Sequence, residues 1–292
     1  MRVLITGARG QLGRALVDLG RGQGWQLWAY DLPEFDLTDV GAVQEAVRTA
    51  QPEVIFNAAA FTAVDRAEEE PEAAFAVNAR AVATLASVAD EVGALLVHLS
   101  TDYVFDGQNS RPYREDDPPN PLSVYGRSKL EGEKAAARAS KHLIVRTSWL
   151  FGRGWNFVEA IRKQLLGGAR QLRVVADQFG RPTYAEDLAE ALVRLVNAGA
   201  YGLFHVANTG ETNWAGFARE IAAQLGFSVP VVDISTEEAG RPAPRPRYSV
   251  LDTAKFDSLG QPLPPWQEAL ARYLGLILHG GGCQNISYGG VP

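Results

Sequence analysis

The chain has 292 residues, of which 46% are hydrophobic and 21% are charged, and its formal net charge at pH 7 is −6. Such a chain can bury a sizeable core, which excludes a disordered protein and a small disulfide-stabilised one. Its single cysteine, Cys283, excludes an intrachain disulfide and a cysteine metal cluster, and its acidic balance argues against a nucleic-acid partner. Because we find no signal sequence and no apolar run of about 18 residues, we expect a cytoplasmic protein without a membrane partner.

Short apolar segments alternate with segments of helical spacing in the first half of the chain. The pattern predicts strands at 2–6, 27–30, 54–56, 95–99 and 143–147, and helices at 11–21, 40–49, 73–92 and 123–139. Alternation of this kind predicts an α/β fold, a doubly wound parallel sheet of the Rossmann type with helices on both faces. Ligands bind such sheets at the carboxyl ends of the strands.

The second half of the chain is less regular and predicts a smaller lobe. Strands are expected at 172–175 and 203–206, and helices at 157–166, 187–196, 214–225 and 265–278. We therefore predict a dinucleotide-binding domain over residues 1–148 and a C-terminal substrate lobe over residues 149–278, some of whose segments return to the first domain. The glycine-rich residues 279–292 lack periodicity and are predicted to form a disordered tail.

A GxxGxxG motif, from Gly7 through Gly10 to Gly13, lies between the first predicted strand and the first predicted helix. Glycine permits a tight turn and a close approach of the backbone to a pyrophosphate, and the N-terminus of the following helix offers N–H groups to its oxygens. A glycine-rich turn without a ligand is the alternative, but the strand–turn–helix context favours a dinucleotide cofactor.

Two residues near this motif indicate different cofactors. Asp31 ends the second strand about 20 residues further on, where an acid bonds the adenosine ribose hydroxyl of NADH. Arg9 lies inside the glycine loop, where a guanidinium can meet the 2′-phosphate of NADPH. Both cofactors therefore stay open. Asp36 and Leu37 are expected beside the adenine, although Asp36 equally fits a cap of the next helix.

A second motif, Tyr125 followed four positions later by Lys129, is placed on the helix expected at 123–139. Positions i and i+4 share one helix face, so the phenol and the ammonium can converge, and a nearby positive charge lowers the pKa of a tyrosine toward the range useful for proton transfer. Thr101, at the end of the fourth strand, can hydrogen-bond a substrate carbonyl or a nascent alkoxide. The alternatives are a surface tyrosine–lysine pair and an ordinary turn at the strand end.

These motifs stand within longer segments that resemble a known family. The chain resembles the extended short-chain dehydrogenases/reductases and, more narrowly, the dTDP-4-dehydrorhamnose reductase family. The likeness extends over roughly residues 1–275 and includes NAAAFTAVDRAE (57–68), STDYVFDG (100–107), RTSWL (146–150), DQFGRPT (177–183) and LPPWQEAL (263–270).

The resemblance implies a role for each matching residue. Tyr125 is expected to donate the proton, Lys129 to hold the nicotinamide ribose and lower the pKa of Tyr125, and Thr101 to bond the 4-keto oxygen of the sugar. Asn78 matches an asparagine that supports this lysine through water. Cofactor contacts are implied for Gly7, Gly10, Gln11, Leu12, Asp31, Asp36, Leu37, Ala60, Thr62, Tyr125 and Lys129, and substrate contacts for Thr101, Asp102 and Trp149.

The implied reaction is the NADPH- or NADH-dependent reduction of the C4 ketone of dTDP-4-dehydro-β-L-rhamnose to dTDP-β-L-rhamnose, a step of polysaccharide biosynthesis. Another nucleotide-sugar 4-ketoreductase stays open, because the two would differ mainly in pocket shape. A dehydratase of the same superfamily is disfavoured, because Tyr103 and not a second acid follows Asp102. A catalytically silent NADP-binding regulatory subunit is the interpretation from another class, and the intact Thr101, Tyr125 and Lys129 argue against it.

The resemblance also concerns partners. The diphosphate of the dTDP-sugar substrate needs cations, and the candidates are Arg181, Arg241, Arg245 and Arg247. Some family members form a magnesium-bridged dimer through a glutamate early in the first helix. This chain has Ala15 there, so we predict no metal site, while a homodimer without that metal stays open.

Overall fold

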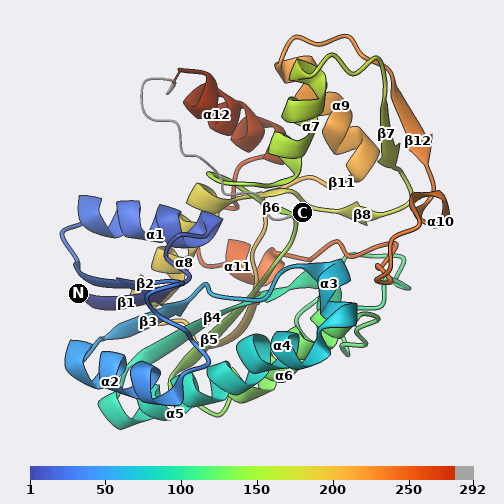
Figure 1. Cartoon of the computed structure of the whole chain (residues 1–292). Helices are drawn as coiled ribbons and strands as arrows, with labels where there is room; N and C mark the ends of the chain where they lie inside the picture. The colour runs from blue at the N-terminus through green and yellow to red at the C-terminus, as the bar shows by residue number, and fades with distance from the viewer. Residues whose placement is uncertain (280–292) are drawn as a thin grey trace.

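Six strands form the central sheet of the computed structural model, which describes residues 1–279 (Figure 1). Across the sheet they follow the order β2-β1-β3-β4-β5-β10, and every neighbouring pair is parallel. This confirms the predicted doubly wound parallel sheet, whose order reverses between β1 and β3, the kind of point at which such sheets bind ligands. The strands are β1 (Arg2–Thr6), β2 (Gln26–Tyr30), β3 (Val54–Asn57), β4 (Leu95–Thr101), β5 (His142–Thr147) and β10 (Gly202–His205).

Successive residues of each strand face opposite layers of helices. In β1, Val3 and Ile5 pack into the apolar core on one face, and Leu4 packs into the core on the other. Because the sheet is buried on both faces, its strands read in the sequence as continuous apolar runs. The first core contains α1 (Gln11–Gly22) and α8 (Ala185–Asn197), and the second contains α2 (Val40–Ala50), α5 (Ala81–Val92) and α6 (Val124–Ala136).

The helix expected at 73–92 is present, but it contains a π-helical turn that the sequence did not predict. The structure has α3 (Val64–Glu69), α4 (Pro71–Phe75), a π-helical segment η1 (Ala76–Arg80) and then α5. The π-helical segment places Asn78 so close to α6 that a Cβ on Gly132 would lie 2.0 Å from the Asn78 carbonyl oxygen. A π-turn of this kind is a local adjustment to packing, which apolar periodicity does not report.

A separate apolar core fills the smaller lobe, drawn above the sheet in Figure 1. Phe151 lies in it, 1% exposed, with the rings of Tyr184, Phe217 and Tyr273 at centroid distances of 5.4, 5.8 and 5.7 Å. Aromatic pairs at such distances attract beyond the effect of burial alone. The main elements are α7 (Phe157–Leu166), α9 (Trp214–Gln224), α12 (Trp266–His279), β7 (Leu172–Val175) and β12 (Val231–Ile234), of which the sequence did not predict β12.

Segments from the second half of the chain return to the sheet, as predicted. β10 pairs with β5, and α8 packs in the core beside α1. The domain boundary after residue 148 stays a prediction. The remaining short elements are β6 (Leu150–Phe151), β9 (Thr183–Tyr184), β8 (Phe179–Gly180), β11 (Thr212–Asn213), η2 (Asp102–Val104), α10 (Thr236–Ala239) and α11 (Ala254–Asp257).

The end of the chain differs from the prediction at one residue. His279 is the last residue of α12, and the rest of the predicted tail, 280–292, lies outside the described residues. Within residues 1–279, no helix combines the length and the apolar character needed to span a membrane.

Candidate active site

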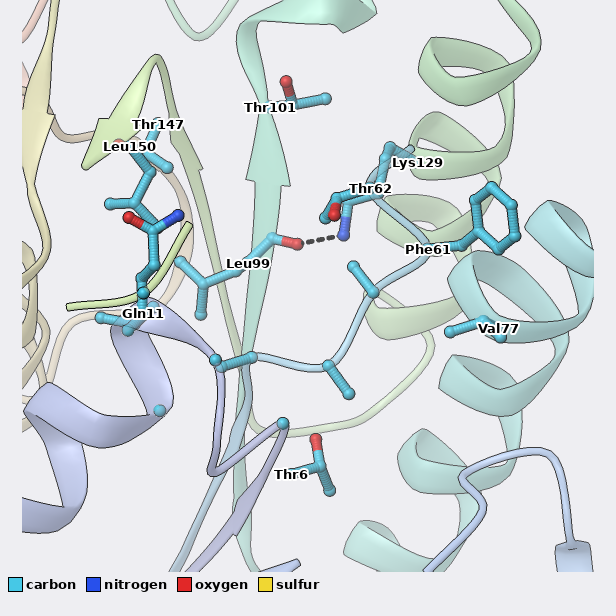
Figure 2. Close-up of a pocket in the computed structure, with 18 of the residues that line it drawn as sticks. Thr6, Gln11, Phe61, Thr62, Val77, Leu99, Thr101, Lys129, Thr147 and Leu150 are labelled. Carbon is cyan, nitrogen blue, oxygen red and sulfur yellow. Dashed lines mark hydrogen bonds between the residues drawn. The ribbon is translucent and has the colours of Figure 1, made fainter. Parts of the chain in front are cut away.

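A cavity of about 820 Å³ opens at the carboxyl ends of the parallel strands. In Figure 2, Lys129 of α6 lies on one side of β4, and Gln11 at the start of α1 lies on the other. The volume falls within the range of about 300–1,000 Å³ that is usual for small-molecule sites. The lining includes every residue for which the family resemblance implies a catalytic role, a cofactor contact or a substrate contact: Gly7, Gly10, Gln11, Leu12, Asp31, Asp36, Leu37, Ala60, Thr62, Thr101, Asp102, Tyr125, Lys129 and Trp149.

The glycine motif forms a cradle at one end of this cavity. Gly7 has a φ of +69°, and a Cβ there would lie 2.6 Å from the backbone nitrogen of Ala59. A Cβ on Gly13 would lie 2.0 Å from the carbonyl oxygen of Gly7, so the turn closes only with glycine at both positions. Gly10 is the N-cap of α1 and has no side chain to cap it. The first N–H groups of α1 are therefore available to an anion.

Two buried side-chain oxygens of the cavity lining lack a hydrogen-bond partner within residues 1–279. They are Oε1 of Gln11 and Oγ1 of Thr147. A buried polar atom without a partner costs free energy, unless a ligand or water supplies the missing bond. Both residues line the cavity, so a polar ligand bound there could supply the missing hydrogen bonds.

The loop after β2 contains an acid and a paired arginine. The Asp31 carboxylate accepts the backbone N–H groups of Leu32 at 2.7 Å and of Arg9 at 2.6 Å. The guanidinium of Arg9 pairs with the carboxylate of Glu34, with Nη2 and Oε2 2.8 Å apart. This hydrogen bond lowers the pKa of the Glu34 carboxyl. Asp31, which favours NADH, and Arg9, which favours NADPH, therefore lie next to each other. The carboxylate of Glu34 partly neutralises the charge of Arg9.

Asp36 and Leu37 line the cavity in the following residues of the same loop. Asp36 accepts the backbone N–H of Thr38 at 2.8 Å, whereas Asp39 caps α2 by accepting the N–H of Ala42 at 3.0 Å. The interpretation of Asp36 as the helix cap is therefore wrong, because the helix starts one turn later than that cap would require.

β4 ends in a hydroxyl and a buried carboxyl. The Thr101 hydroxyl donates to Oδ1 of Asp102 at 3.0 Å and accepts the N–H of Tyr103 at 3.2 Å. Asp102 is 1% exposed, and the Ser249 hydroxyl donates to its Oδ2 at 2.5 Å. Burial raises the pKa of Asp102 to about 7, although these hydrogen bonds oppose the rise. Near neutral pH this carboxyl is therefore partly protonated.

Tyr125 and Lys129 lie one turn apart on α6 and both line the cavity. Lys129 is 3% exposed, and its ammonium donates to the carbonyl oxygen of Leu99 at 2.5 Å (Figure 2). Burial lowers the pKa of Lys129 to about 8. Burial raises the pKa of Tyr125 to about 12, and a hydrogen bond with Thr101 offsets part of the rise. Lys129 is not among the groups that shift the pKa of Tyr125, so the expected lowering by Lys129 stays a prediction.

Asn78 ties the loop after β3 to α6. Its Oδ1 accepts the N–H of Phe61 at 2.8 Å, and its Nδ2 donates to the Phe61 carbonyl oxygen at 3.0 Å and to the Ser128 hydroxyl at 2.9 Å. Phe61 and Thr62 line the cavity, so these bonds set the position of that wall relative to α6. The link from Asn78 to Lys129 through water stays a prediction.

Comparison with known proteins places the chain in a family. The family described as RmlD substrate binding domain matches residues 1–278. The dTDP-4-dehydrorhamnose reductase of Streptomyces griseus is 43% identical over an alignment of 279 positions, which covers 92% of this chain and 91% of that protein. The chain belongs to the dTDP-4-dehydrorhamnose reductase family.

Two solved structures of dTDP-4-dehydrorhamnose reductases have the same fold. The protein of Clostridium acetobutylicum is 42% identical, with a TM-score of 0.92, and the match covers 95% of this chain and 100% of that one. The protein of Bacillus anthracis, solved in complex with NADP, is 38% identical, with a TM-score of 0.90, and the match covers 94% of this chain and 98% of that one.

Trp149, for which the family resemblance implies a substrate contact, lies in an aromatic wall of the cavity. Its backbone has a φ of +48°, and its ring stacks on Trp214 with centroids 3.6 Å apart and 9° between the planes. Gly180 packs against the same ring, since a Cβ there would lie 2.5 Å from it. Trp214 also lines the cavity, and the sequence analysis missed it because it stands far from any motif of the family.

The arginines considered for the substrate diphosphate do not occur among the described residues of the cavity lining. Arg245 instead holds Asp65 of α3 through Nη1 at 3.0 Å and Nη2 at 2.8 Å, and Arg181 donates to the Thr253 hydroxyl at 3.2 Å. These two side chains link segments of the protein. Arg153 lines the cavity and was not considered, because no motif marks it.

Ala15, which stands where some members of the reductase family have a glutamate, is 4% exposed in the core between α1 and α8. Within residues 1–279, no group of three or more His, Cys, Asp and Glu side chains is placed to hold a metal ion. The lack of a metal site nevertheless stays a prediction.

Proposed function

We propose that this chain reduces the C4 ketone of dTDP-4-dehydro-β-L-rhamnose to dTDP-β-L-rhamnose, with NADPH or NADH as the reductant. The observation that carries the proposal is the meeting of Thr101, Tyr125 and Lys129 in the cavity that the glycine cradle also lines. A hydroxyl, a phenol and an ammonium beside a dinucleotide cradle suit the delivery of a proton to a ketone oxygen. The two reductases named above, 42% and 38% identical, support the choice of substrate.

The cradle fits a nicotinamide dinucleotide. Gly10 and the N-terminus of α1 would hold the pyrophosphate, Asp31 the adenosine ribose and Lys129 the nicotinamide ribose. The unpaired oxygens of Gln11 and Thr147 add two acceptors on the same lining. The bound, reduced nicotinamide would supply the hydride that C4 accepts.

Side chains of the protein deliver the proton to the ketone oxygen. With a pKa of about 12, the Tyr125 phenol keeps its proton at neutral pH, which is the state that an acid must have before it donates. The Thr101 hydroxyl can turn from Asp102 to the ketone oxygen and stabilise the charge that develops there. The Lys129 ammonium stabilises the phenolate that remains. Because Asp102 has a pKa of about 7, it repels the developing negative charge less than a fully ionised carboxylate would.

The carboxylate of Glu34 is expected to control the choice between NADPH and NADH. It neutralises Arg9 beside Asp31, where the adenosine ribose would lie. In Glu34→Gln we expect the ratio of kcat/KM for NADPH to kcat/KM for NADH to rise several-fold, because Arg9 is then available to a 2′-phosphate. Glu45→Gln changes an exposed glutamate of α2 in the same way and should leave the ratio unchanged. An unaltered ratio in Glu34→Gln would contradict this role.

The direct test follows the oxidation of NADPH, and separately of NADH, with dTDP-4-dehydrorhamnose generated in situ. We expect oxidation with dTDP-L-rhamnose as the product, identified by mass spectrometry and NMR. Cofactor binding without oxidation would contradict the proposal and favour a different nucleotide 4-keto sugar or the regulatory-subunit alternative.

A cytoplasmic location and a homodimer stay predictions. Size-exclusion chromatography with light scattering measures the second, and a mass of 31.6 kDa would correspond to a monomer.

A further inference from the structure

Behind the catalytic face of α6, one buried carboxylate joins three elements of the active site. Glu133 lies one turn after Lys129 on α6 and is 6% exposed. Its Oε1 accepts the hydroxyl of Ser100 on β4 at 2.5 Å. Its two oxygens also accept the guanidinium of Arg146 on β5, from Nε at 2.8 Å and from Nη2 at 2.7 Å. The carboxylate therefore holds α6, β4 and β5 together through hydrogen bonds of the strong, charge-assisted kind.

The hydrogen bond between Glu133 and Ser100 lies next to the proposed reacting groups in the chain. Ser100 stands between Leu99, whose carbonyl oxygen accepts the Lys129 ammonium, and Thr101, whose hydroxyl is proposed to bond the ketone. A shift of β4 along α6 would therefore move Thr101 relative to Lys129. A displacement of about 1 Å at a catalytic group is enough to cost a large factor in rate.

The positive partner of this carboxylate is itself buried and oriented. Arg146 is 2% exposed, lies over the ring of Phe105 with 5.0 Å to its centroid, and places Nη1 3.4 Å from Nε2 of His205. Burial and the charge of Arg146 lower the pKa of His205 to about 3, so His205 is neutral. Arg146 is thus the charged partner of Glu133, and the uncharged His205 does not compete for it.

The charge of Glu133 also affects the protonation of Lys129. The titratable groups on the elements around this lysine are His98 on β4, Asp102 in η2, Tyr125 and Glu133 on α6, and Arg146 on β5. Burial lowers the pKa of His98 well below its ordinary value, so His98 carries no charge. Among the influences on Lys129, burial lowers its pKa to about 8, and the charge of Glu133 acts in the opposite direction.

We propose that Glu133, held by Ser100 and Arg146, is a positioning residue of the reductase, which fixes β4 against α6 and keeps Lys129 protonated during turnover. A buried ion pair is weak evidence for stability, because the cost of desolvating its charges often exceeds their attraction. The proximity of this pair to Lys129 and Thr101 supplies a catalytic reason for it. The kinetic part of the inference rests on the proposed reduction, whereas the charge of Lys129 can be measured without turnover.

The first experiment measures that charge in Glu133→Gln/Arg146→Met. The double change is chosen because Glu133→Gln alone would leave the buried guanidinium without a counter-charge. The chain has only five lysines, so labelling with lysine carrying ¹³C at Cε yields few signals, and Lys129→Met identifies the signal of Lys129. We expect the titration midpoint of Lys129 to fall by about one unit in the double variant.

The pH dependence of activity should change together with the titration midpoint of Lys129. The alkaline limb of the kcat/KM profile reports the loss of the Lys129 proton, so it should move to lower pH by the same amount in the double variant. Glu131→Gln is the matched control, since Glu131 lies on the same helix but is exposed and pairs with Lys134 at 2.7 Å. It should leave both the midpoint and the limb unchanged.

A second variant, Ser100→Ala, tests the tie between α6 and β4 without touching a charge. We expect kcat to fall several-fold, while the Lys129 midpoint and the KM for the sugar stay near their wild-type values. This small change does not depend on whether the double variant folds.

Two results would overturn the inference. One is a folded double variant whose Lys129 midpoint and alkaline limb match the wild type, and the other is a Ser100→Ala enzyme with unchanged kcat. If no variant, including the wild type, reduces the sugar, the proposed function fails, but the Lys129 titration still decides the charge part of the inference.

Discussion

Replacing Tyr125 by phenylalanine is expected to lower kcat for the ketone about 10²- to 10⁴-fold, which is the usual contribution of a positioned general acid. The change removes the phenolic proton but keeps the ring, which packs edge to face against Tyr103 with centroids 5.8 Å apart. The fold and the cofactor cradle should therefore be intact. Steady-state kinetics measure the loss of kcat, and a fluorescence titration with NADPH checks that the dissociation constant is unchanged.

Tyr201→Phe is the matched control for this prediction. Tyr201 is 58% exposed and lies outside the cavity lining, so the same chemical change there should leave kcat as it is. A Tyr125→Phe enzyme that kept more than about a tenth of the wild-type kcat would contradict the role of Tyr125, since a general acid contributes at least about 10²-fold.

Gly13→Ala is expected to have the largest effect on cofactor binding. The new Cβ would lie 2.0 Å from the carbonyl oxygen of Gly7 and 2.7 Å from the Cα of Ala8, and both are backbone atoms that cannot turn away as a side chain can. Forcing atoms into a packed site costs about 1–3 kcal/mol. If the cradle opens to relieve the clash, NADPH binding should weaken about 10- to 100-fold, since about 1.4 kcal/mol corresponds to a factor of ten.

Isothermal titration calorimetry with NADPH measures this loss of affinity. A thermal melt measures Tm and shows how far the substitution destabilises the fold. Gly22→Ala is the matched control, because Gly22 ends the same helix and a Cβ there would meet nothing within 4 Å. Gly13→Ala with wild-type affinity and wild-type Tm would show that the turn closes in a way that differs from the structure.

The outline of the fold and the membership of the site could be predicted from the sequence. The strands at 2–6, 54–57 and 95–101 are apolar runs that end in a motif, and period-two burial on both faces of a parallel sheet produces runs of this kind. The glycine spacing and the tyrosine–lysine spacing are local, so a reading of the chain alone finds them. Apart from the four arginines considered for the diphosphate, every residue proposed to contact the cofactor or the substrate lines one cavity.

The errors have a common physical cause. The helix at 73–92 contains a π-turn that the sequence did not predict, at the point where α6, from a distant part of the chain, packs close to Asn78. Arg245 was considered for the substrate but bonds Asp65, and Trp214 was missed although it stacks on Trp149. In each case the contacting residue comes from a distant part of the chain. Local periodicity carries no information about such contacts.

The sheet, the cradle for the dinucleotide and the chemical groups that would reduce a ketone could all be found in the sequence. These depend on spacings of a few residues and on the identity of side chains. The protonation of those groups, in contrast, follows from the packed structure. Burial raises the pKa of Tyr125 to about 12 and lowers the pKa of Lys129 to about 8. The charge of Glu133 opposes the lowering at Lys129. The reason is that a pKa depends on solvent exclusion and neighbouring charges, which exist only once distant segments have packed together.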